Sequence, residues 1–181
     1  MLIADFLGWP QILALAVLLQ RGLEELHSAR NTARLMQQGA QETGSDFYPV
    51  VAVSHLAWIA AIALLVPPEA AVNWWILLVY VALQAARYWI IGSLGRYWTH
   101  RIITLETAPI ITRGPYRLVR HPNYVVTVME TFLLPLVFGA WQLSVIMSAI
   151  WIAVIVYKVR LEDQALASRR AADGTAPGEM R

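Results

Sequence analysis

The sequence predicts an all-α integral membrane protein with about five transmembrane helices, of which the last two form a helical hairpin. Three observations support this fold class. Of the 181 residues, 58% are hydrophobic and 14% are charged, whereas soluble domains carry about 25% charged residues. The apolar residues form runs long enough to cross a bilayer, which takes about 20 helical residues. The basic residues gather in alternate connections between these runs, as they do in multi-span membrane proteins.

We expect the first three spans at residues 6–20, 48–66 and 72–91. Pro10 lies near the start of the first span, where proline is tolerated in the first helical turn. The helical pattern continues beyond that span to Gln38, and Gly39 is a typical C-terminal cap. Pro67 and Pro68 end the second span, because proline cannot continue a helix.

The last apolar stretch, residues 125–157, is too long for one span of about 20 residues. Pro135 and Gly139 near its middle indicate a turn. The stretch therefore predicts a hairpin of two short spans, at residues 125–138 and 141–157. The residues from Ala167 onward are small and polar and include glycine and proline. We therefore expect a single membrane-embedded domain over 1–166 and a disordered cytoplasmic tail over 167–181.

The distribution of lysine and arginine predicts the orientation of the chain. None of the 14 precedes residue 21 or lies in the connections at 67–73 and 138–141. Five lie in the segment 96–120, and five follow from Lys158 onward. Since the cytoplasmic side carries the excess of these residues, we expect the N-terminus outside and the C-terminus in the cytoplasm. An aromatic belt would agree, with Trp9, Trp74, Trp75 and Trp141 at the outer interface and Tyr88, Trp89, Trp98 and Tyr157 at the inner one.

Composition excludes several classes of function. The chain has no cysteine, so disulfides and thiolate chemistry are both excluded. Its net charge of +2 is too small to suggest a nucleic-acid partner. The four histidines show no i,i+4 pair, so we expect no metal site. No glycine-rich phosphate loop and no Gly-x-Ser-x-Gly elbow occurs.

The chemically distinctive residues collect on the predicted cytoplasmic side, in segments 92–124 and 157–166. The first contains Arg-Gly-Pro-Tyr-Arg-x-x-Arg-His-Pro-x-Tyr at 113–124. Positive charge alone would satisfy the topology, but topology does not require the fixed order Arg-His-Pro-x-Tyr. In the second segment, Glu162 and Asp163 follow an apolar helix, where two carboxylates oppose the helix dipole and favour a cationic partner or a ligand. The two segments predict a site for an anionic or zwitterionic ligand that opens toward lipid.

Two charged residues, Arg87 and Glu130, fall inside predicted spans. Charged side chains are costly in the bilayer unless they are paired or functional. One interpretation is a mutual salt bridge that allows both to be buried. The other is a polar pocket for the head group of a substrate. The sequence leaves both interpretations open.

The motif at 113–124, followed by the hairpin and by Arg-x-Glu-Asp-x-x-Leu at 160–166, resembles the isoprenylcysteine carboxyl methyltransferase superfamily of integral-membrane enzymes. The resemblance covers about residues 90–166. In the front half, Gln20-Arg21, Ala29-Arg30-Asn31 and Tyr48-Pro49 resemble a bacterial branch found beside type III polyketide synthases. Members of that branch O-methylate alkylpyrones or alkylresorcinols, which implies a protein of the bacterial inner membrane.

This resemblance implies S-adenosylmethionine as the cofactor, bound on the cytoplasmic side. It implies an alkylpyrone, an alkylresorcinol or a prenylcysteine as acceptor, methylated on a ring hydroxyl, an enol or a carboxylate. The acceptor would enter from the bilayer among membrane lipids. The cofactor-binding residues that the resemblance implies are Tyr116, Arg117, Leu118, His121, Pro122, Tyr124, Glu162 and Asp163. Asp163 stands where family members often have glutamate.

For catalysis we expect Arg160 to orient the acceptor oxygen or to bind the cofactor carboxylate. A less acidic phenol would need a general base, and Glu130 is the candidate for that role. We expect Arg87, Trp98 and His100 to bind the substrate. Two other classes of function remain open at this point: a membrane reductase that uses NADPH, because some sterol-type reductases share a similar C-terminal arrangement, and a non-catalytic membrane scaffold.

Overall fold

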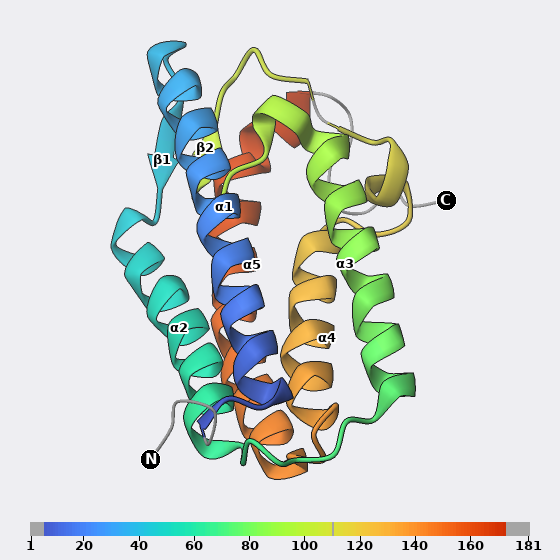
Figure 1. Cartoon of the computed structure of the whole chain (residues 1–181). Coiled ribbons are helices and arrows are strands. Elements are labelled where there is room, and N and C mark those ends of the chain that lie inside the picture. The colour runs from blue at the N-terminus through green and yellow to red at the C-terminus, as the bar shows by residue number, and fades with distance from the viewer. Residues whose placement is uncertain (1–5, 110, 173–181) are drawn as a thin grey trace.

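The computed structural model describes residues 6–109 and 111–172. Its main elements in that part of the chain are five helices that lie side by side in a bundle (Figure 1). The helices are α1 (Trp9–Gln37), α2 (Tyr48–Leu65), α3 (Trp74–Leu94), α4 (Pro122–Leu136) and α5 (Trp141–Ala172). The connections hold the strands β1 (Gln41–Thr43) and β2 (Ile102–Thr104) and the 3-10 helices η2 (Ser45–Phe47), η3 (Gly95–Tyr97) and η4 (Gly114–Arg117). The predicted helical architecture is confirmed.

Three of the helices are long and apolar enough to cross a membrane. They lie in the stretches Ser45–Leu65, Trp74–Tyr97 and Trp141–Ala167. These stretches overlap three of the five predicted spans. Together with the apolar surface of the bundle they describe an integral membrane protein. α4 has only 15 residues, and α1 carries charged residues in its second half. Both pack in the same bundle (Figure 1), and their role as spans stays a prediction.

The glycines and the proline that predict helix ends and turns lie at such positions in the structure. Gly39 follows the end of α1 with a φ of 86°, a left-handed conformation that suits glycine at a helix C-terminus. Pro135 lies inside the last turn of α4, and the N–H of Ala140 donates to its carbonyl oxygen at 3.1 Å. Gly139 completes this turn with a φ of 71°. The hairpin predicted for residues 125–157 is thus present as α4, a short turn and α5.

The C-terminal boundary differs from the expectation. We expect a disordered tail from residue 167, but α5 continues to Ala172. The residues at 165–172 are mainly alanine, leucine and arginine, which have high helix propensity and allow the helix to extend beyond its apolar part. Residues 173–181 lie outside the described part of the chain.

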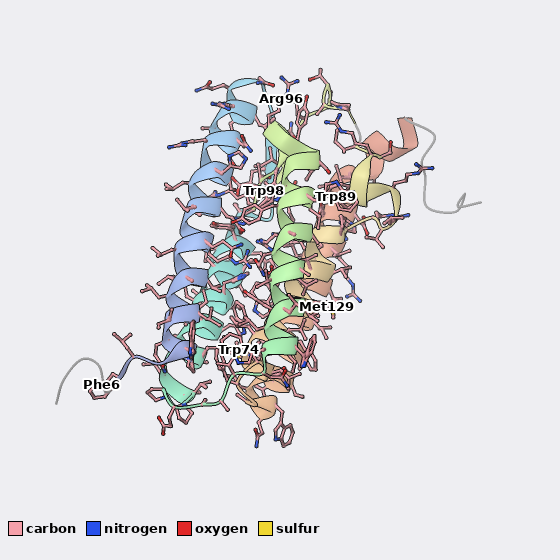
Figure 2. The ribbon with its side chains drawn as sticks, turned by 45° about the vertical axis from the view of Figure 1, so that its right-hand side comes forward. Phe6, Trp74, Trp89, Arg96, Trp98 and Met129 are labelled. Atoms are coloured by element: carbon pink, nitrogen blue, oxygen red, sulfur yellow. The ribbon has the colours of Figure 1, made fainter. Side chains whose placement is uncertain are left out.

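The two ends of the bundle differ in character. One end is closed by an apolar cluster between α1, α2, α4 and α5, which includes the fully buried Trp58, Ile62 and Leu134. At the other end, β1 and β2 form a two-stranded antiparallel sheet in which Glu42 pairs with Ile103. Figure 2 shows Trp74 near the first end and Arg96 and Trp98 near the second. Helix ends and basic loops therefore meet at the sheet end, where the candidate site lies.

Candidate functional site

A cavity of about 480 Å³ lies at the sheet end of the bundle. Its wall is built from β2 and its flanking residues, η4, the start of α4 and the last third of α5. The resemblance implies eight cofactor-binding residues. Six of them line this cavity: Tyr116, Arg117, Leu118, His121, Tyr124 and Glu162. Trp98, predicted to bind the substrate, also lines it. Pro122 and Asp163 lie directly beside lining residues.

Gly114 allows the loop that leads into η4 to pack closely against α3. Its φ is 60°, and a Cβ atom at this position would lie 2.7 Å from Oγ of Ser93 and 3.5 Å from Nε1 of Trp89. Both the backbone conformation and the close approach to α3 therefore require glycine. Pro115, the next residue, is buried and is the second residue of η4. The Gly-Pro pair thus holds the motif against the end of α3.

We expect Gly114→Ala to lower the free energy of unfolding by about 1–3 kcal/mol, because it forces alanine into a left-handed conformation and into contact with Ser93. Equilibrium unfolding of detergent-solubilised protein measures the change. Gly92→Ala is the matched control, since Gly92 lies in α3 with no atom within 4 Å of a Cβ. Equal effects of the two substitutions would contradict the role of Gly114.

The start of α4 and the end of α5 meet through a small polar cluster. The hydroxyl of Tyr124 donates to Oε2 of Glu162 at 2.6 Å. Nδ1 of His121 lies 3.5 Å from the same oxygen, and Nε2 lies 3.3 Å from Oδ1 of Asp163. The rings of His121 and Tyr124 stack with centroids 5.5 Å apart. The two distant motifs of the sequence therefore form one surface.

Two further lining residues, Asn123 and Tyr116, can form hydrogen bonds to a ligand. The side-chain oxygen of Asn123 is buried and has no hydrogen-bond partner among the described residues, although buried acceptors normally have one. Burial, with a smaller contribution from the charge of Glu162, raises the pKa of Tyr116 above its ordinary value. Tyr116 is thus a neutral hydrogen-bond donor at physiological pH. Asn123 stands at the unspecified position of the motif Arg-His-Pro-x-Tyr, so the motif did not predict a role for it.

Lys158 is the cation that α5 contributes to the cavity wall, which Arg101, Arg117 and Arg120 also line. We expected Arg160 to be the cation from this segment. Nζ of Lys158 donates to the carbonyl oxygen of His100 at 2.7 Å and lies 5.4 Å from the ring centroid of Tyr124. No ion pair among the described residues includes Lys158. Lys158 and Glu162 are spaced by four positions and share one helix face, whereas Arg160 lies about 200° around the helix from Lys158 at about 100° per residue. Arg160 is exposed and does not line the cavity.

Glu130 and Arg87 lie inside the bundle in a buried cluster of four charges, away from the cavity wall. Arg87 contacts Glu24 at 2.6 Å and Glu130 at 3.3 Å, and Arg21 contacts Glu24 at 2.7 Å and Glu130 at 2.6 Å. The ion pair between Arg87 and Glu130, one of the two interpretations that the sequence left open, is present. The other oxygen of Glu130 accepts from Gln84 at 3.0 Å. Both carboxylate oxygens of Glu130 accept hydrogen bonds, and the residue does not line the cavity. Its role as a general base stays a prediction.

A polar stripe on α1, formed by Glu25, Ser28 and Asn31, binds the segment 95–100 that precedes β2. Asn31 donates to the carbonyl oxygens of Gly95 and Trp98 at 3.2 and 2.9 Å. The backbone N–H of His100 donates to Oγ of Ser28 at 2.8 Å, and its ring lies 2.7 Å from Glu25. Burial lowers the pKa of His100, although the hydrogen bond to Glu25 acts in the opposite direction. His100 therefore supports the wall from behind and is not among the lining residues.

The comparisons with known proteins agree with the motifs. The sequence profile of the isoprenylcysteine carboxyl methyltransferase (ICMT) family matches residues 75–168, slightly more than half of the chain. A relative from Bacillus subtilis (strain 168), described as "Uncharacterized protein YpbQ", is 30% identical over 159 residues. The alignment covers 86% of this chain and 95% of the relative. No solved structure matches the chain.

Proposed function

The chain belongs to the isoprenylcysteine carboxyl methyltransferase family, and from this premise we propose that it is an S-adenosylmethionine-dependent methyltransferase that acts on an oxygen of a lipophilic substrate. The observation that carries the proposal is the cavity at the sheet end. Its wall brings His121 and Tyr124 of one motif into contact with Glu162 of the other. Glu162 lies 38 or more positions from the other two residues in the sequence.

The lining residues fit the proposed cofactor chemically. The cavity volume of about 480 Å³ lies in the range of roughly 300–1,000 Å³ that small-molecule sites occupy. The carboxylate of Glu162 would bind the amino group of the cofactor, and the buried oxygen of Asn123 would accept a hydrogen bond from its nucleoside. The aromatic rings of Tyr116 and Tyr124 would face a cationic sulfur, which such rings attract.

When bound, S-adenosylmethionine supplies an electrophilic methyl group on its sulfonium. The residues of the chain then have to bind the two substrates, orient the acceptor oxygen toward the methyl group and exclude water. We propose that Lys158 binds the acceptor oxygen, because this partly buried ammonium lines the cavity and forms no salt bridge among the described residues. A nearby cation favours the ionised form of a carboxylate, an enol or an acidic phenol. Such an acceptor needs no general base, which agrees with the burial of Glu130 away from the cavity lining.

The substrate class follows from the surroundings of the cavity. Its wall includes apolar residues such as Leu105 and Ile103, and the bundle presents exposed apolar side chains such as Leu23 and Trp89 to the membrane. A long hydrocarbon tail can therefore remain in the bilayer while an acidic head group reaches Lys158. Alkylpyrones and alkylresorcinols have this character, and we propose them as methyl acceptors in preference to prenylcysteines. The basic loops around the cavity favour a cytoplasmic site.

Calorimetric titration with S-adenosylhomocysteine, with NADPH as a parallel ligand, tests this proposal. We expect binding of S-adenosylhomocysteine alone, and a rise in Kd of about 10-fold or more in His121→Ala and Glu162→Gln, because each loses a contact to a charged group. Arg34→Gln, an exposed position on α1, is the control. Undiminished binding in both site variants would refute the site. Binding of NADPH alone would replace the methyltransferase by a reductase.

A further inference from the structure

The rim of the cavity is formed by residues 113–120, here called the rim segment. It includes η4 and contains three arginines and no acidic residue. Leu118 is 78% exposed and Val119 is 45% exposed, and both line the cavity. Large apolar side chains at such exposure, placed between cations, are typical of a segment that contacts a membrane surface.

The rim segment lies at the level where α3 leaves the membrane. Gly114 approaches Ser93 and Trp89 of α3, and both belong to the stretch Trp74–Tyr97 that is long and apolar enough to span. Figure 1 shows η4 outside the bundle beside the upper part of α3. Trp89, labelled in Figure 2, is 56% exposed, and tryptophan favours the interface between head groups and hydrocarbon. The segment therefore borders the head-group layer.

The three arginines of this segment are available for an external anion. Arg113, Arg117 and Arg120 are exposed, and none belongs to an ion pair among the residues that the structure describes. Arginine binds phosphate oxygens in a bidentate manner. Each basic residue near an anionic membrane surface also gains attraction from it. The charge of the rim segment is thus complementary to phospholipids with net negative charge.

We propose that the rim segment is a binding site for anionic phospholipids of the surrounding membrane. Arg113, Arg117 and Arg120 bind the lipid phosphates, and Leu118 and Val119 enter the acyl region beside them. The bound lipids cover the mouth of the cavity on its membrane side. Arg117 and Leu118, which the resemblance assigns to the cofactor, then contact lipid at the rim. The site needs no methyl transfer and stands independently of the proposed activity.

The absence of cysteine from the chain allows a direct test. Full-length protein carrying Leu118→Cys is labelled with a fluorophore and reconstituted in nanodiscs of phosphatidylcholine and phosphatidylglycerol. Bromine is placed on one lipid or the other in otherwise identical mixtures, so that quenching reports which lipid is near residue 118. We expect brominated phosphatidylglycerol to quench several-fold more strongly, and we expect added salt to reduce the excess. A label at Leu64, 81% exposed and at the other end of the bundle, should show no such preference.

A charge-matched pair of variants completes the test. Arg117→Gln with Arg120→Gln should remove the preference at residue 118. Arg30→Gln with Arg34→Gln, two exposed arginines of α1, removes the same charge and should leave it unchanged. Equal quenching by the two brominated lipids at residue 118 would overturn the proposal, and so would the absence of quenching by either. A preference that responds equally to both pairs would also overturn it, because it would reflect net charge alone.

Discussion

Arg87→Met is expected to lower the free energy of unfolding by about 3–5 kcal/mol, the typical cost of removing one partner from a buried ion pair. In the native protein, the guanidinium groups of Arg21 and Arg87 balance the carboxylates of Glu24 and Glu130. Without Arg87, two buried carboxylates share one cation, and Glu24 loses bonds of 2.8 and 2.6 Å. Equilibrium unfolding in mixed micelles of mild and denaturing detergent measures the loss.

Two controls separate charge balance from lost packing. Arg34→Met changes an exposed arginine and should shift stability by no more than about 0.5 kcal/mol. The double variant Arg87→Met with Glu24→Leu removes one charge of each sign, so it should be more stable than Arg87→Met alone. A loss below about 1 kcal/mol in Arg87→Met, or a double variant less stable than the single one, would show that the cluster is not balanced as described.

Lys158→Met is expected to reduce kcat/KM for methyl transfer by about 10- to 100-fold, the value of a hydrogen bond to a charged group. The ammonium of Lys158 lines the cavity, so its loss removes a cation that we propose stabilises an ionised acceptor. Lys158→Arg should restore part of the activity. Arg160→Gln should stay within about twofold of the parent, because Arg160 lies on another face of α5. Turnover of an alkylresorcinol or alkylpyrone with labelled methyl donor measures these effects.

The acidity of the acceptor distinguishes this role from a structural one. Lys158 also binds the carbonyl oxygen of His100, so a purely structural effect would lower activity equally for every acceptor. Stabilisation of an anion predicts a larger loss for weakly acidic hydroxyls than for strongly acidic ones. Equal losses across acceptors, or a larger effect of Arg160→Gln than of Lys158→Met, would contradict the assignment of Lys158.

The helices of the bundle could be predicted because their signals are local. Apolar runs, the prolines that limit them and glycines such as Gly39 and Gly139 each act within a few residues. The structure confirms the helical architecture and the hairpin of α4 and α5. The extension of α5 to Ala172 was missed because polarity and nearby glycine were weighed above the helix propensity of alanine and arginine. The strands β1 and β2 have only 3 residues each, too few for a periodic pattern.

The residues of the site could be predicted only in part. A motif shows which residues stand together in the chain, and the structure places His121, Tyr124 and Glu162 around one cavity. The choice between Lys158 and Arg160 depends on the face of α5 that meets α4. That face becomes known only once the helices are packed, although the spacing of four between Lys158 and Glu162 was a usable signal.

The sequence by itself determined the membrane class, the helices, the hairpin and the family, because each of these follows from composition, local patterning or an ordered motif. Only the tertiary structure decided which charges neutralise one another and that Lys158, not Arg160, lines the cavity. Arg21 and Glu130 are separated by 109 positions, and the polar stripe of α1 reaches Trp98 across 67. Such contacts arise from the packing of whole helices, in which an unpaired buried charge is too costly to remain.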